Sequence, residues 1–269
     1  MKKLVAIAAV VFFASFLGCK EKSPEEQGKE ALKAAAEKVP VSPDKVVTEA
    51  AKAIKEGNLV LVYAMLPDSY QADVQGLVKK IGENMDKEVY EKGFALLPKA
   101  VEAAKKAEQF KPFAPVAEGT VKLLTDAKLN THDGLKAFDA AAFLNANGKA
   151  IMDLVWKGAE RLGQKDAQKM LEVTAKLKGE AGEKEATVEI TMGGKTKEEK
   201  FVKVEGKWIP EEMSKEWKKG IEDAGKNIEG ALKGMTEKKA EIVAQIDAFG
   251  KMLDEGNVEQ LQGMMGSMF

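Results

Sequence analysis

The sequence predicts a helix-rich α+β fold, in which long amphipathic helices pack on a small antiparallel meander at about residues 169–210 and C-terminal helices follow. Two observations lead to this prediction. Apolar residues recur at helical spacing through most of residues 43–163 and again through 211–262, whereas between these segments they alternate with polar residues. A meander with one apolar face needs a cover, which the long helices can supply. We expect residues 30–269 to form one domain.

The composition excludes several classes of protein. The chain of 269 residues holds 42 Lys and Arg against 43 Asp and Glu, with a single Cys, Cys19, and a single His, His132. One Cys and one His cannot build a disulfide framework, a zinc site of the Cys/His type or an iron–sulfur site. With a net charge of −1, the chain lacks the basic footprint of a nucleic-acid binder. We therefore expect no nucleic-acid partner.

The N-terminus has the pattern of a secretory leader. Met1-Lys2-Lys3 is positively charged, and the 13 residues Leu4–Phe16 hold no charge. A membrane-spanning helix needs about 20 apolar residues, so this stretch is too short to cross a bilayer. It ends at Gly18-Cys19, after which the chain turns polar. The charged residues that follow, to about residue 29, predict a flexible tether.

The segment Phe16-Leu17-Gly18-Cys19 resembles the lipobox of bacterial lipoproteins, although that family usually has Leu and then a small residue where Phe16 and Leu17 stand. The resemblance implies a signal peptide over residues 1–18 and a lipidated Cys19 that attaches the mature protein to a membrane. It implies a location on the periplasmic face of the cell envelope, and Lys20 after the Cys favours the outer membrane over the inner one. An ordinary signal peptide and an uncleaved anchor are the alternatives.

Caps and breakers bound the first helices. Residues 30–39 are Ala-rich and predict a short helix that Pro40 stops. Ser42-Pro43-Asp44 then supplies an N-cap, a proline and an acid for the first turn of a second helix. Gly57 ends this helix, because glycine adopts the left-handed conformation at little cost.

Helical spacing continues to about Gly163. Pro67 and Pro98 are expected to break or kink the helices that they interrupt, because proline lacks the amide donor. Loops are expected at residues 111–115 and 130–134, where turn-forming residues gather.

The apolar period then changes to two. We expect three or four antiparallel strands with their apolar residues on one face. Gly193-Gly194 and Glu205-Gly206 mark turns between strands, and Pro210 with Glu211-Glu212 starts the first C-terminal helix. The alternating apolar residues are Leu171, Val173, Ala175, Leu177, Ala186, Val188, Ile190, Met192, Val202, Val204 and Trp208.

The strand pattern of Ala186–Ile190 and Phe201–Pro210, with the turn Gly206-Lys207-Trp208, resembles uncharacterised envelope lipoproteins that have a nuclear-transport-factor-two-like (cystatin-like) domain. The resemblance covers residues 44–60 and 170–212 and implies helices packed against a curved sheet. Members of that fold include enzymes, binding modules and proteins of no known activity, so the resemblance implies no particular function.

Few residues suggest chemistry. His132 beside Asp133 could act as a general base, but its turn-like setting predicts a solvent-exposed loop residue. A methionine cluster near the C-terminus could bind Cu(I), whereas an apolar helix that docks on the core or on a partner is the interpretation we favour. The cluster consists of Met264, Met265 and Met268.

Other candidate groups have structural interpretations. Gly193-Gly194-Lys195-Thr196 ends like a Walker motif but lacks the preceding glycine spacing, so it is interpreted as a hairpin turn. Pairs of acids are interpreted as solvated faces and helix-dipole partners. These pairs are Glu25-Glu26, Glu198-Glu199 and Glu211-Glu212. Tyr63 and Tyr70 are expected at the edge of the core. Trp208 and Trp217 are expected to pack between sheet and helix. We therefore expect no catalytic residue, no metal site and no cofactor.

These observations favour a membrane-anchored envelope lipoprotein that acts as a non-enzymatic scaffold or interaction protein, with an envelope protein of unknown identity as partner. The alternative is a ligand-binding module, with an apolar cavity behind Val188, Ile190, Val204 and Trp208 that takes a lipid or a small hydrophobe. An enzyme would need polar titratable groups that point inward at those strand positions, where we expect apolar residues.

Overall fold

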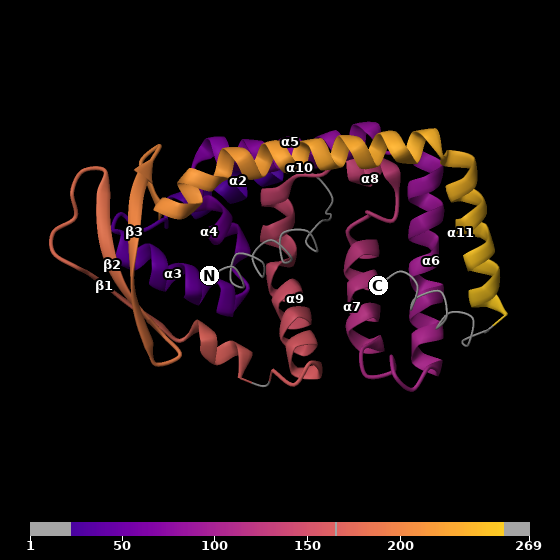
Figure 1. The fold of residues 1–269 in the computed structure, drawn as a ribbon, viewed down its shortest axis with the longest axis horizontal. Coiled ribbons are helices and arrows are strands. Elements are labelled where there is room, and N and C mark those ends of the chain that lie inside the picture. The colour runs from indigo at the N-terminus through magenta and orange to yellow at the C-terminus, as the bar shows by residue number, and fades with distance from the viewer. Residues whose placement is uncertain (1–22, 165, 256–269) are drawn as a thin grey trace.

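The structure, a computed structural model, describes residues 23–164 and 166–255 and confirms the helix-rich α+β fold. In this part of the chain, ten α-helices accompany one four-stranded sheet (Figure 1). The helices are α2 (Pro24–Ala36), α3 (Pro43–Glu56), α4 (Leu59–Ala64), α5 (Asp68–Asn84), α6 (Lys87–Lys106), α7 (Ala114–Asp126), α8 (His132–Lys136), α9 (Ala140–Arg161), α10 (Glu211–Glu237) and α11 (Lys239–Asp254), with a 3₁₀ turn η1 (Ala167–Leu171).

The sheet is an antiparallel meander in the order β1-β2-β3-β4. Gly193-Gly194 and Glu205-Gly206 turn its second and third hairpins with positive φ at both residues, as a type I′ turn requires. Both predicted turns are therefore confirmed. The strands are β1 (Val173–Leu177), β2 (Glu185–Met192), β3 (Lys195–Val204) and β4 (Lys207–Pro210).

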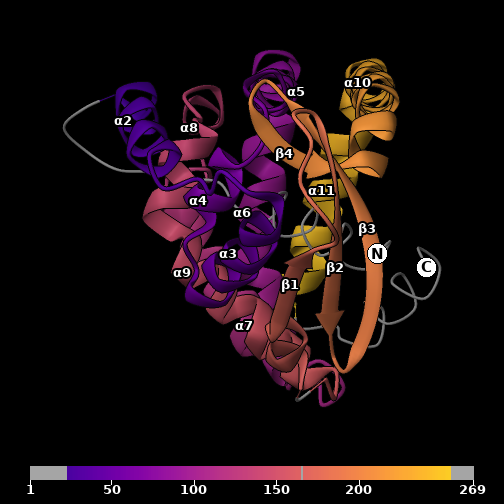
Figure 2. The same ribbon diagram turned by 90° about the vertical axis from the view of Figure 1, so that its left-hand side faces the viewer.

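Helix α3 covers one face of the sheet (Figure 2). Val188 is 0% exposed and Trp208 is 4% exposed, and the Trp208 indole N–H donates to the Val41 carbonyl at 3.0 Å. Side chains of α3 and α4 thus fill the space behind these two residues, where the sequence suggested an apolar cavity. This sheet cluster consists of Val46, Ala53, Leu61, Met65, Ala186, Val188, Phe201 and Trp208.

The expectation that Val204 faces inward is wrong. The two-residue turn after β3 pairs Val204 with Lys207 and Lys203 with Trp208, and paired residues share a face. Val204 therefore lies on the face opposite Trp208, together with Ile209. Helix α10 begins on this second face and contacts β3 and β4, which leaves Ile209 only 2% exposed (Figure 2).

Strand β3 also brings charge to the face that packs on α3. Glu199 lies opposite Val188, its side chain is 10% exposed, and its carboxylate pairs with Lys197 Nζ at 2.6 Å. The inward set is therefore not wholly apolar, and the interpretation of Glu199 as a solvated residue is wrong. Glu198 points to the other face and pairs with the exposed Lys178.

Helix α9 forms the centre of a second cluster, which joins α2, α4 and α7. Its residues Phe143, Ile151 and Met152 are each 1–2% exposed. This helix cluster consists of Ala35, Leu59, Val60, Tyr63, Ala64, Leu123, Ala127, Leu129, Leu135, Phe138, Ala140, Ala141, Phe143, Leu144, Ile151 and Met152. Because α4 follows α3 directly, the two clusters are neighbours in the chain as well as in space.

A backbone contact between Gly57 and Gly148 joins the two clusters. Gly57 ends α3 at φ 74°, as predicted, and turns the chain into α4. A Cβ on Gly57 would lie 2.5 Å from the Cα of Lys149, and a Cβ on Gly148 would overlap the Gly57 carbonyl oxygen. Only glycines allow this approach of the α3–α4 turn to α9.

The predicted tether over residues 19–29 is wrong from Pro24 onward, where α2 begins. Ser23 caps α2 in a capping box with Glu26, and both acids of the first turn suit the helix dipole. The helix packs on α4 and α9, and it ends at Ala36 rather than at Val39. The charged composition of this segment predicts a flexible chain, but packing on α4 and α9 makes it helical. Residues 19–22 lie outside the described part.

Three further boundaries differ from the expectation. Pro67 precedes α5 as expected, but Pro98 lies inside α6, which continues because α7 and α11 pack along it. Leu171 belongs to η1 and not to a strand. The loop expected at residues 130–134 contains the start of α8.

The C-terminal helices lie along the helical layer (Figure 1). Helix α10 packs on α5, where Trp217 stacks on Tyr70 with ring centroids 4.1 Å apart and its indole N–H donates to Asp73 at 2.9 Å. Helix α11 then runs parallel to α6. Two ion pairs spaced by seven residues on both helices join them, Lys92–Asp247 at 2.8 Å and Lys99–Asp254 at 2.6 Å.

Replacing Gly148 by Ala is expected to destabilise the protein, because the new methyl group overlaps the Gly57 oxygen. We expect a loss of about 1–3 kcal/mol in the free energy of unfolding, measured by urea denaturation. Gly158→Ala on the same helix is the matched control, since its Cβ would meet only Val116 at 4.0 Å. It should be neutral or stabilise by up to about 1 kcal/mol. Equal stability of the two variants would contradict the backbone contact.

The carboxyl groups of two N-caps have pKa values shifted in opposite directions. Replacing each by Asn should therefore change the stability at pH 7 with opposite signs. Burial raises the pKa of the Asp139 carboxyl, which caps α9, whereas Lys239 lowers the pKa of Asp86, which caps α6. A carboxyl group whose pKa is raised in the folded state destabilises the protein once the pH is high enough to ionise it. A carboxyl group whose pKa is lowered in the folded state stabilises the protein, and this stability is lost as the pH falls through the lowered pKa. Asn caps a helix as well as Asp does.

We therefore expect Asp139→Asn to raise the unfolding free energy at pH 7, with a gain that shrinks on acidification toward the unfolded pKa near about 3.9. The control, Asp86→Asn, should lower stability at pH 7, by an amount that also shrinks on acidification. Urea denaturation at pH 7 and at lower pH measures both. The same sign for both variants at pH 7 would refute the prediction.

Candidate functional site

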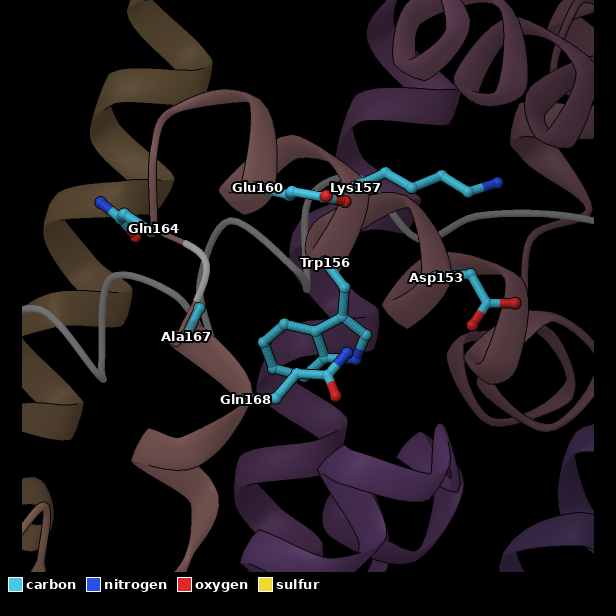
Figure 3. Close-up of a pocket in the computed structure, with 7 residues that line it drawn as sticks. All are labelled: Asp153, Trp156, Lys157, Glu160, Gln164, Ala167 and Gln168. Carbon is cyan, nitrogen blue, oxygen red and sulfur yellow. The ribbon is translucent and has the colours of Figure 1, made fainter.

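A pocket at the C-terminal end of α9 is the most promising site among the described residues (Figure 3). Its volume is about 370 Å³, within the range of small-molecule sites. The lining, which we call the Trp156 pocket, comes from α9, from the turn after it and from η1. The residues are Asp153, Trp156, Lys157, Glu160, Gln164, Ala167 and Gln168.

The helical period of α9 brings four of these residues to one side. Asp153, Trp156, Lys157 and Glu160 follow one another at spacings of three, one and three residues, which places them on adjacent turns of one face. Trp156 is half-buried and packs at the edge of the helix cluster. Its side chain points from α9 toward Ala167 and Gln168 of η1 (Figure 3).

A Schellman turn carries the chain back over the end of α9. Gly163 has φ 77°, its N–H donates to the Glu160 carbonyl at 3.0 Å, and the Gln164 N–H donates to Ala159 at 2.9 Å. The Gln164 carbonyl then accepts from Ala167 at 3.0 Å. These bonds hold the Gln164 backbone across from α9.

The polar groups of the pocket are open to a ligand. Within the described residues, neither the indole N–H of Trp156 nor the side-chain amides of Gln164 and Gln168 make a hydrogen bond, and Lys157 and Glu160 make no ion pair. Asp153 pairs with Lys149 at 3.5 Å. The remaining charges on the lining, Lys157 and Glu160, balance each other.

A second pocket, of about 420 Å³, lies between α2, α4 and α9. It has no aromatic side chain, and alanines form much of its wall. Its lining is Gln27, Glu30, Ala31, Ala34, Ala35, Lys38, Asn58, Val60, Leu61 and Asn145. Neither pocket is lined by a residue of the sheet.

The expectation of an exposed His132 is wrong. The residue starts α8, is 6% exposed, and its Nε2 has no hydrogen-bond partner among the described residues. Tyr90 lies against it with ring centroids 6.3 Å apart and donates to the Leu129 carbonyl at 2.6 Å; burial raises the pKa of Tyr90 to about 12. Because His132 lines neither pocket, the geometry does not support a role as a general base.

The aromatic residues singled out in the sequence are structural. Tyr63 is 4% exposed and donates to the Gln71 carbonyl at 2.9 Å, and burial raises its pKa. Trp208 packs between sheet and helix as expected. Trp217 stacks on Tyr70 and joins two helices rather than sheet and helix.

Several predicted features lie outside the described residues, namely Cys19 and the cluster of Met264, Met265 and Met268. In residues 23–164 and 166–255, no group of three or more His, Cys, Asp or Glu side chains is arranged to hold a metal ion. No helix in the same ranges is long and apolar enough to span a membrane. Gly193-Gly194 forms a hairpin turn, as expected.

Reasoning from the sequence did not single out the Trp156 pocket. One signal was available, since a tryptophan lies among charged residues on the outer face of a helix that Gly163 ends. The return of Gln164 and Gln168 over that face depends on the turn after the helix, and the period alone does not predict it.

Comparisons of the chain with protein-family models, with curated proteins and with solved structures gave no match. The site therefore has to be judged on its own chemistry.

Substitutions at Gly163 are expected to destabilise the turn in the order of their tolerance for positive φ. Gly163→Ala should cost about 1–2 kcal/mol, Gly163→Asn less, and Gly163→Val more. Space does not decide this order, because a Cβ on Gly163 meets nothing within 4 Å. Urea denaturation measures the effect, and three variants as stable as the wild type would show that the turn does not require glycine.

Proposed function

We propose that the protein is a membrane-anchored, non-enzymatic interaction protein of the bacterial cell envelope, with acyl chains on Cys19 as its anchor and another envelope protein as its partner. One observation carries the proposal: the only cysteine of the chain stands where the uncharged stretch Leu4–Phe16 gives way to polar sequence. A triacylated cysteine has enough chains for stable attachment, whereas a single chain binds a bilayer only marginally.

The length of chain between the anchor and the folded body supports a position close to the leaflet. Four residue steps separate Cys19 from Ser23, which caps α2, and they span at most about 14 Å. The start of α2 lies against the start of α9, where Gly28 approaches Asp139. An anchor at Cys19 therefore holds this junction near the lipid headgroups.

The packing of the body supports a scaffold over the alternative ligand-binding module. Behind Val188 and Trp208, where the alternative requires an apolar cavity, side chains of α3 and α4 form the sheet cluster. The helices that follow the sheet present long polar faces, and they pack on α5 and α6 in one helical layer. Such a layer is a suitable surface for a protein partner.

Replacement of Cys19 tests the anchor. Cys19→Ala should abolish incorporation of labelled palmitate and move the protein from the membrane to the soluble fraction of cell extracts, because no acyl acceptor remains. Lys20→Asp keeps the cysteine and is the matched control, so it should retain the label. Its distribution between the inner and outer membranes shows whether residue 20 decides the location. Membrane partition and labelling that survive Cys19→Ala would refute the anchor. Chemical cross-linking in cells should yield a larger species that the Cys19→Ala variant forms less of.

A further inference from the structure

The Trp156 pocket has the composition of a site for a neutral, hydroxyl-rich ligand. Trp156 contributes an indole face, and its N–H is a donor. Gln164 and Gln168 each offer donors and acceptors through one amide, so they can bond a hydroxyl group in either orientation. A sugar ring matches this set, because its C–H bonds suit the negative face of an indole while its hydroxyls both donate and accept.

The charges of the pocket argue against an ionic ligand. Among the described residues, Glu160 and Lys157 have no ion-pair partner, whereas Asp153 is paired with Lys149 at 3.5 Å. Because the charges of Glu160 and Lys157 balance each other, the lining does not select an ion of either sign. The five polar side chains of the lining disfavour a lipid chain, which would leave them without partners.

Local contacts support two parts of the pocket. Trp156 packs on the helix cluster from behind, and the Schellman turn at Gly163 holds the segment that carries Gln164. Binding therefore has to order the exposed side chain of Gln168 but not the backbone bonds of the turn.

We propose that the Trp156 pocket binds a neutral saccharide, with one sugar ring stacked on the Trp156 indole and its hydroxyls bonded by the Gln168 amide, which lies beside the indole (Figure 3). Trp156 follows Asp139 by 17 residues, about 25 Å along α9, so an anchor at Cys19 would leave the pocket well away from the attachment point. This placement rests on the proposed anchor, whereas the ligand class does not.

Calorimetric titration of the full chain, in a detergent without a sugar headgroup, tests the proposal. The probes are chitotriose, cellotriose and maltotriose, with tetramethylammonium and inorganic phosphate as ionic comparisons. At least one trisaccharide should bind with a Kd between about 10 μM and 1 mM and perturb tryptophan fluorescence. The ionic probes should not bind. Trp208 is 4% exposed and Trp217 is stacked on Tyr70, so Trp156 is the ring positioned to report binding.

Variants locate the site. Trp156→Ala should weaken binding at least about tenfold, Trp156→Phe less, and Gln168→Ala a few-fold, with circular dichroism to confirm that each folds. Gln245→Ala, an exposed glutamine on α11, is the matched control and should bind like the wild type. No binding of any trisaccharide at about 10 mM would overturn the proposal. So would binding of only an ionic probe, or binding that neither Trp156 variant weakens. If the Cys19→Ala variant loses its acyl chains but still binds the saccharide, the saccharide site does not depend on the anchor.

Discussion

The close approach of Gly57 and Gly148 is the constraint on which the rest of the structure depends. Helix α3 ends at Gly57, and its apolar side supplies Val46 and Ala53 to the sheet cluster. Helix α4 starts two residues later and supplies Leu59 and Val60 to the helix cluster. Because the turn between them rests directly on the α9 backbone, the sheet, α3 and α9 are held at one spacing. A side chain at either glycine would force the two clusters apart.

Helix α9 connects the proposed anchor region with the Trp156 pocket. Its first residues lie beside α2, whose cap Ser23 is four residue steps after Cys19, and its last turn contributes to the Trp156 pocket. The proposed anchor and the proposed saccharide site are thus at opposite ends of one well-packed helix. The C-terminal helices do not line the pocket. The exposed ion pairs that join α11 to α6 add little stability individually. Helix α10 is linked to the body more strongly, through the stacking of Trp217 on Tyr70.

The tertiary structure changed the expected role of several residues for identifiable reasons. Glu199 was expected in solvent and has a side chain only 10% exposed, because the β2–β3 register places it opposite Val188 on the face that packs on α3. His132 was expected in an exposed loop and is buried, because α8 packs against α5 and α6. Residues 24–29 were expected to be flexible and are helical, because the capping box at Ser23 and contacts with α9 compensate for their polar composition.

The sequence by itself determined what depends on near neighbours in the chain. Helical and alternating periods gave the α+β class, Gly57 gave a helix end, and Gly193-Gly194 and Glu205-Gly206 gave the hairpins, since positive φ is a local requirement. The lipobox-like segment at Cys19 is also a local pattern, and it remains a prediction. The tertiary structure alone decided which face Val204 takes, whether Pro98 interrupts α6, and that Gln168 lies beside Trp156. Each of these depends on strand register, on helix packing or on the path of a turn, which are set by residues distant in the chain or by cooperative packing that no local pattern encodes.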